Sequence, residues 1–166
     1  MWSVDHKVIG IQYGVTSLLF LLFGFFLMMV MRYQLAYPET PIPIVGWFFS
    51  ESNGIMLPEN YNTLGAMHGT IMIFLGVVPL AVGAFGNYLV PLQIGAPDMA
   101  FPKLNAASYW SYFVGGVIML ASFFTPEGAA RSGWTSYPPL SIFESGQTMW
   151  LCGMIFLITS SLLGSM

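Results

Sequence analysis

The sequence predicts an all-α fold: a polytopic transmembrane helical bundle with four spans. Charged residues make up 7% of the 166 residues, whereas soluble globular domains contain about 25%. The mean hydropathy is +0.73, and the apolar residues are gathered into four long runs. A run of about 20 apolar residues can cross a bilayer as a helix. The surface is therefore expected to contact lipid, and four basic residues are too few for a nucleic-acid-binding patch.

The first two runs lie in residues 11–31 and 63–92. The first has no charge and exceeds the roughly 7–15 apolar residues of a signal peptide, and no good cleavage site follows it. It is predicted to be a retained span. The second run contains two prolines, and proline lacks the peptide N–H that a helix interior needs. Pro79 is predicted to kink this helix and Pro91 to end it.

The third and fourth runs lie in residues 106–124 and 148–166. Long loops rich in Pro, Gly, Asn and Ser precede the second and the fourth run, and a short turn precedes the third. The sequence ends in SSLLGSM, inside an apolar run with no flanking charge. This ending predicts a chain that is cut from a longer protein.

The orientation of the bundle is weakly marked. Two lysines and two arginines fall on opposite sides of the predicted membrane, so the positive-inside rule gives a tie. Five of the seven acidic residues lie in the long loops, although acids count little in that rule. These five are Glu39, Glu51, Glu59, Glu127 and Glu144. The interpretation adopted here puts these loops outside and the N-terminus inside.

His68 lies in the second run, and an ionisable side chain within a membrane span indicates function by default. Gly65, Gly69, Gly76 and Gly83 fall within about 40° of one another at 100° per residue, and His68 shares their broad face. In one interpretation this stripe packs on a neighbouring helix and His68 forms an interhelical hydrogen bond. In the other, a flat haem lies along the glycines and the imidazole binds its iron.

Four motifs resemble the N-terminal part of subunit I of the haem–copper oxidases, most closely the cytochrome c oxidase type. In order they are DHKVIGIQY, MHGTIMIF, FGNYLVPLQIGAPDMAFPKLN and GWTSYPPL, and SSLLGSM resembles the stretch that leads into eight further helices. The resemblance covers essentially the whole chain. It implies that these four spans belong to a twelve-helix subunit, as one part of a single membrane domain.

The resemblance implies roles for several residues around a haem. His68 is expected to be an axial ligand of a low-spin haem, interpreted as haem a. Arg32 is expected to contact a substituent of that haem, with Trp134 and Tyr137 near its edge or propionates. Each has a simpler alternative, since Arg32 could be a snorkelling residue and both aromatic residues could be interfacial anchors.

The resemblance also implies a proton path at the other end of the second span. Asp98 is expected to open it, with Asn87 and Asn105 flanking the path and Tyr13 and Ser108 nearby. The alternative for Asp98 is a helix cap or a solvated loop residue. Amides can hold water without titrating readily, which suits a path. His6, which the implied roles do not use, is expected to lie at the surface.

The complete enzyme implied by the resemblance takes electrons from cytochrome c, reduces O2 to water and pumps protons. Its second haem and its copper have ligands beyond residue 166, so this chain alone is expected to be inactive. The expected partners are other oxidase subunits and lipid, in a bacterial plasma membrane or an inner mitochondrial membrane. Two alternatives stay open: a quinol oxidase of the same fold, and a cofactor-free transporter or structural subunit.

Overall fold

The computed structural model describes residues 3–126, 128–142 and 146–166, and within these ranges all regular structure is helical. Four helices are long and apolar enough to cross a membrane: His6–Ala36, Pro58–Ile94, Pro102–Phe124 and Gly146–Gly164. The predicted all-α class and the four spans are therefore confirmed. The first two helices extend beyond the predicted runs at both ends, and the third at its start. Glu127 and Glu144 lie outside the described residues.

The first helix, α1 (His6–Ala36), starts at a capping aspartate. The Asp5 carboxylate accepts hydrogen bonds from the peptide N–H groups of Lys7 (2.8 Å) and Val8 (3.2 Å). These two bonds lower the pKa of Asp5. They also satisfy two of the donors that a helix N-terminus leaves without partners, so the helix begins immediately after this residue.

The second span is one continuous rod of four segments: α2 (Pro58–Thr70), η2 (Ile71–Val77), η3 (Pro79–Gly86) and α3 (Asn87–Ile94). The segments η2 and η3, on either side of Val78, are π-helical, and such wide turns are typical of functional sites. The prediction that Pro91 ends the helix is wrong. The helix passes through Pro91 and ends at Gly95, whose φ of 71° is the left-handed conformation that glycine favours.

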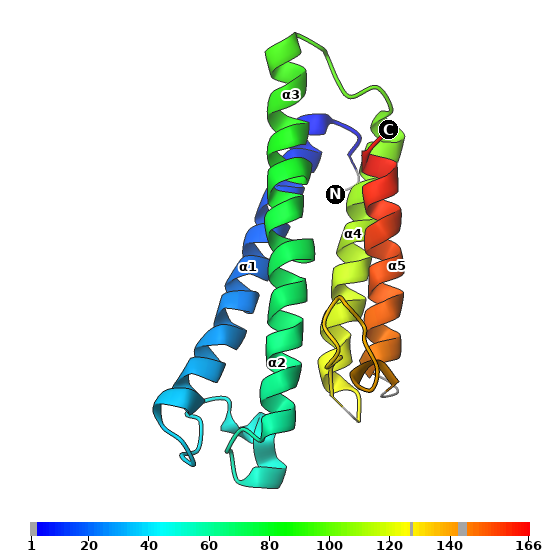
Figure 1. Ribbon diagram of the computed structural model, residues 1–166. Coiled ribbons are helices and arrows are strands. Elements are labelled where there is room, and N and C mark those ends of the chain that lie inside the picture. The colour runs from blue at the N-terminus through cyan, green and yellow to red at the C-terminus, as the bar shows by residue number, and fades with distance from the viewer. Residues whose placement is uncertain (1–2, 127, 143–145) are drawn as a thin grey trace.

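The remaining helices, α4 (Pro102–Ala121, continued by η4, Ser122–Phe124) and α5 (Gly146–Gly164), lie side by side (Figure 1). They approach closely at two glycines, because a Cβ on Gly115 would lie 2.8 Å from the carbonyl oxygen of Gly153. Short 3₁₀ helices η1 (Gly46–Ser52) and η5 (Leu140–Ile142) lie in the long loops.

The bundle has two distinct ends (Figure 1). The start of α1, the α3–α4 turn and the end of α5 lie together at what we call the turn end. The loops that precede α2 and α5 lie at the opposite end, called the loop end. His68 lies in the half of its rod nearer the loop end, whereas Asn87 and Asp98 lie towards the turn end.

Candidate functional site

His68 is tied to the neighbouring helix through one ring nitrogen. Its Nδ1 lies 2.8 Å from the carbonyl oxygen of Gly24 on α1. A carbonyl only accepts, so Nδ1 carries the hydrogen and, in the neutral ring, Nε2 keeps its lone pair. Among the described residues nothing hydrogen-bonds to Nε2, and the ring is half-buried. The interhelical bond is thus present, and it leaves one nitrogen free to bind a metal.

A histidine with one nitrogen bonded to a carbonyl and the other nitrogen free fits an axial haem ligand. A metal-binding histidine generally donates its other N–H to a carbonyl or carboxylate, which fixes the tautomer and the ring orientation, as the Gly24 carbonyl does here. In the described part of the chain, no group of three or more His, Cys, Asp or Glu side chains could hold a metal ion. The chain's other histidine, His6, donates to the Asn87 carbonyl towards the turn end, so a second histidine ligand for a haem at His68 would have to come from elsewhere.

The glycine stripe packs against α1 in its second half and is not a groove there. A Cβ on Gly76 would lie 2.5 Å from Leu21 Cδ2, and one on Gly83 would lie 2.6 Å from Tyr13 Cδ1. The helix-packing interpretation is correct for both glycines. Gly65 also faces α1, because a Cβ there would lie 3.4 Å from Met31 Cε.

Trp134 lies beside Gly69, the residue that follows His68, whereas the other two expected haem contacts are exposed. A Cβ on Gly69 would meet the Trp134 ring at 3.1 Å, and this ring packs edge-to-face on Phe74 at 6.0 Å. Arg32 is exposed, and eight residues of helix place it about 12 Å beyond Gly24 along α1. Tyr137 is 72% exposed. Neither side chain has a hydrogen bond, ion pair or ring contact within the described residues.

Asp98 lies half-buried in the turn between α3 and α4. Its Oδ1 accepts a hydrogen bond from the peptide N–H of Met99 at 2.7 Å. The cap position of α4 is occupied by Phe101, so the capping interpretation of Asp98 is wrong. The carboxylate keeps acceptor capacity, because one such bond uses only one of its roughly four lone-pair sites.

Asn87 and Asn105 are both more than nine-tenths buried, and each has an amide atom without a partner in the described part of the chain. The unpaired atoms are the acceptor Oδ1 of Asn87 and the donor Nδ2 of Asn105. The Asn87 Nδ2 donates to the Gly83 carbonyl. A buried polar atom left unpaired costs about 1–3 kcal/mol, and ordered water commonly satisfies such atoms. An acceptor on one helix and a donor on another are suited to hold water.

Tyr13 and Ser108 are in direct contact, as two members of a buried hydroxyl cluster. The Tyr13 hydroxyl lies 2.8 Å from Ser108 Oγ and 3.3 Å from Ser160 Oγ. Ser108 also donates to the Ser160 carbonyl at 2.7 Å. The sequence analysis missed Ser160, although a pair of serines inside the last apolar run was a usable signal. No side-chain hydrogen bond joins Asp98 to this cluster within the described residues.

His6 is another residue that the sequence analysis placed incorrectly. It is 2% exposed and not at the surface. Its Nδ1 lies 2.8 Å from the carbonyl oxygen of Asn87, so the ring donates to this carbonyl. His6 is thereby packed against the same asparagine whose side chain was expected to flank the proton path.

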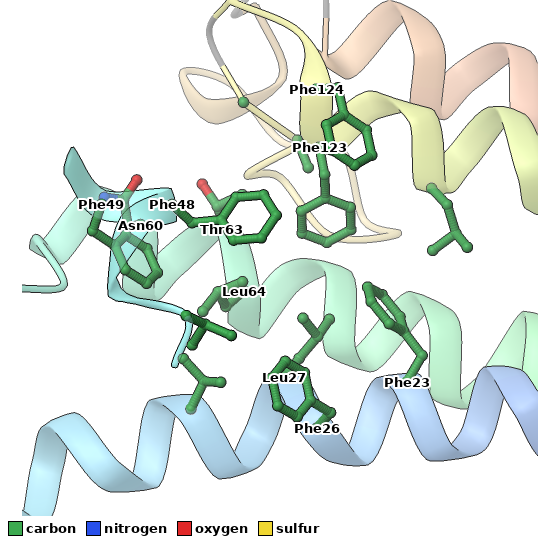
Figure 2. A pocket seen from close by; sticks show the side chains of 15 residues that line it. Phe23, Phe26, Leu27, Phe48, Phe49, Asn60, Thr63, Leu64, Phe123 and Phe124 are labelled. Atoms are coloured by element: carbon green, nitrogen blue, oxygen red, sulfur yellow. The ribbon is translucent and has the colours of Figure 1, made fainter. Parts of the chain in front are cut away.

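An apolar cavity of about 400 Å³ opens at the loop end between α1, α2 and the end of α4. Figure 2 shows phenylalanine rings from three parts of the chain around it: Phe23 and Phe26, Phe48 and Phe49, and Phe123 and Phe124. Asn60 and Thr63 are the polar side chains of its lining, and among the described residues no ionisable side chain lines it. Thr63 already donates its hydroxyl to the Glu59 carbonyl.

A known family accounts for this arrangement. The family model described as Cytochrome C and Quinol oxidase polypeptide I matches residues 8–166. The chain belongs to this family. The match covers all four spans and all the candidate residues from Tyr13 to Tyr137, and it agrees with the resemblance on which their roles were assigned. Members of this oxidase family are polytopic helical membrane proteins, so the present chain is an integral membrane protein.

Curated relatives match almost the whole chain. It is 49% identical over 166 residues to cytochrome c oxidase subunit 1 of Thermostichus vulcanus and 48% identical to the protein of that name from Synechocystis sp.. Each alignment covers 99% of this chain and 27% of the relative. A probable cytochrome c oxidase subunit 1-alpha of Streptomyces avermitilis is 41% identical, with 98% and 26% covered. The chain thus spans about a quarter of the length of these relatives.

Proposed function

We propose that this chain forms part of the core subunit of a terminal respiratory oxidase, with His68 as an axial ligand of a low-spin haem. The observation that carries the proposal is the Nδ1 bond from His68 to the Gly24 carbonyl, which leaves Nε2 without a partner among the residues that the structure describes. The complete oxidase transfers electrons from cytochrome c to O2, forms water and pumps protons. The family and the names of the relatives support this activity.

The bound haem, proposed to be haem a, supplies one-electron transfer within the membrane. His68 holds its iron, and the Gly24 carbonyl orients the ring and increases its basicity. Trp134 borders this position, and the positive charge of Arg32 favours the reduced state of a nearby haem. The ligands of the second haem and the copper are proposed to lie outside these 166 residues. The same holds for the contacts to other oxidase subunits.

The turn end is proposed to admit protons. Asp98 receives them at the membrane surface, which is the inner surface in this proposal because the N-terminus lies inside. Asn87 and Asn105 hold water through the amide atoms that lack protein partners. Tyr13 and Ser108 then border the path with hydroxyls that already contact each other. The path needs no further ionisable group at these positions, because hydroxyls and amides can order water without trapping its proton.

The electron donor is proposed to be cytochrome c and not a quinol. Oxidation of a quinol releases protons, so its site needs polar partners and a proton acceptor. Within the described part of the chain, the cavity at the loop end offers Asn60 and Thr63 as its polar side chains, and the Thr63 hydroxyl already has an acceptor. The three relatives are named as cytochrome c oxidase subunits, which agrees with this choice.

A His68→Ala variant of the complete oxidase tests the proposal. We expect loss of the low-spin haem band from the reduced-minus-oxidised spectrum and loss of cytochrome c-dependent O2 consumption. His6→Ala is the matched control, because it also removes a buried histidine that donates to a carbonyl. This control should keep the low-spin band. A His68→Ala oxidase with an unchanged band would show that another residue binds the haem, and quinol-only turnover would overturn the proposed donor.

A further inference from the structure

Gln147 is a buried amide at the start of α5, and both ends of its amide bind the loop that precedes this helix. It is 4% exposed. Its Oε1 accepts a hydrogen bond from the Ser132 hydroxyl at 2.8 Å, and its Nε2 donates to the Ser136 hydroxyl at 3.2 Å. A buried amide needs partners for its polar atoms, and here the partners lie four residues apart in one loop. We call these three residues the Gln147 bridge.

The Gln147 bridge spans Trp134, which lies midway between the two serines. The Trp134 ring is 52% exposed, although it borders Gly69 and packs edge-to-face on Phe74 at 6.0 Å. These contacts cover only part of the ring. The position of the ring therefore depends also on the backbone of the loop that carries it.

The backbone of this loop is bent on both sides of Trp134. Gly133 has a φ of 61° and Ser136 has a φ of 50°. Glycine adopts this left-handed conformation readily, whereas it is uncommon for a residue with a side chain. Such a conformation persists where the surrounding structure holds it. Gln147 binds the hydroxyl of the strained residue, Ser136, and so helps to hold the bend.

The first turn of α5 is itself fixed against the beginning of the same loop. Gly146 directly precedes Gln147 and lies against the backbone of Gly128, because a Cβ on Gly146 would overlap the Gly128 carbonyl oxygen. Both glycines belong to the described part of the chain. This close contact leaves Gln147 little freedom to move, so its amide is a fixed point to which the loop is bound.

We propose that Gln147 is a positioning residue that holds the Trp134 ring at the haem bound by His68. The haem part of this inference rests on the proposed function. Gln147 acts through Ser132 and Ser136 on the loop backbone, and it does not itself contact the haem or carry a proton. The surroundings of a haem tune its potential, so a displaced Trp134 ring should change the low-spin haem.

Gln147→Met in the complete oxidase is the test, because methionine has a similar length and forms neither hydrogen bond. We expect a structure of this variant to show a displaced Trp134 ring, and we expect the low-spin haem band and midpoint potential to shift. Ser132→Ala should shift them in the same direction, whereas Ser132→Thr keeps a hydroxyl and should match the wild type. Thr135→Val is the matched control, since the Thr135 hydroxyl donates to the Ser132 carbonyl at 3.4 Å and not to Gln147.

Three results would overturn the inference. They are an unmoved Trp134 ring in the Gln147→Met structure, a displaced ring with an unchanged haem band and potential, and a shift in Thr135→Val as large as that in Gln147→Met. The position of the ring is measured without reference to the haem ligand. A failed haem assignment would therefore appear separately, as an unchanged low-spin band in His68→Ala.

Discussion

Gly83→Ala is expected to damage the second span because this glycine faces the Tyr13 ring. A Cβ at this position would lie 2.6 Å from Cδ1, 2.7 Å from Cγ and 3.0 Å from Cε1 of Tyr13. The ring cannot easily move aside, since it packs on Tyr109 at 5.2 Å and Tyr112 at 5.1 Å between centroids. Overpacking of this kind typically costs about 1–3 kcal/mol.

Gly86→Ala is the matched control on the same segment, because a Cβ there would have nothing within 4 Å. Both substitutions gain about 1 kcal/mol of helix propensity, so the difference between them isolates the contact with Tyr13. We expect Gly83→Ala to be about 1–3 kcal/mol less stable than Gly86→Ala in denaturant unfolding of the oxidase in detergent. Proton uptake should also slow, because a displaced Tyr13 loses its 2.8 Å contact with Ser108. Equal stability of the two variants would refute this packing argument.

Three further predictions concern the ends of the helices. Asp98→Asn should abolish proton uptake by this route while the Met99 N–H keeps an acceptor, and unchanged pumping in reconstituted vesicles would contradict the role. Asp5→Ala should destabilise the start of α1, and Asp5→Asn should do so less because its amide oxygen still caps. Folding lowers the pKa of Asp5, so its stabilising effect is complete above the usual aspartate pKa and should disappear as pH falls through the lowered value. The measurement is the unfolding of wild type and Asp5→Ala as a function of pH. A difference between the two that does not change with pH would exclude the charged cap. Gly69→Ala would place a Cβ 3.1 Å from the Trp134 ring, so it should displace the ring and shift the low-spin haem band. A band at the wild-type position would show that Trp134 does not contact the haem.

The sequence was sufficient to predict the fold class and the spans because hydropathy is a local property. The four apolar runs located the four helices. The helix ends differ from the ends of the runs because polar residues, such as those before Leu64, are also helical. The continuation of the helix through Pro91 could not be predicted from the sequence. Proline disfavours a helix interior because it removes one hydrogen bond and its ring crowds the preceding turn. Here the carbonyl four residues before Pro91, that of Asn87, accepts from a histidine 81 positions earlier in the chain.

The sequence indicated which residue types form the candidate site, but not which of these residues contact each other. Tyr13 and Ser108 were expected to lie near the proton path, and their contact with each other was not predicted. Ser160 joins them from a helix that sequence reasoning left without a role. Helix packing explains most of the glycine stripe, because a Cβ on Gly65, Gly76 or Gly83 would meet a side chain of α1. The π-helical segments of this span were not predicted, since a change of helix type depends on packing between helices and not on one run of residues.

The central claim is that the Nε2 nitrogen of His68 binds iron within the membrane. The most direct measurement is an experimental structure of the assembled oxidase, at a resolution that shows the ring and any porphyrin. The account predicts Nδ1 bonded to the Gly24 carbonyl and Nε2 within bonding distance of a haem iron whose second axial ligand comes from outside these 166 residues. A His68 ring that faces lipid or another helix, with no porphyrin in contact, would contradict it.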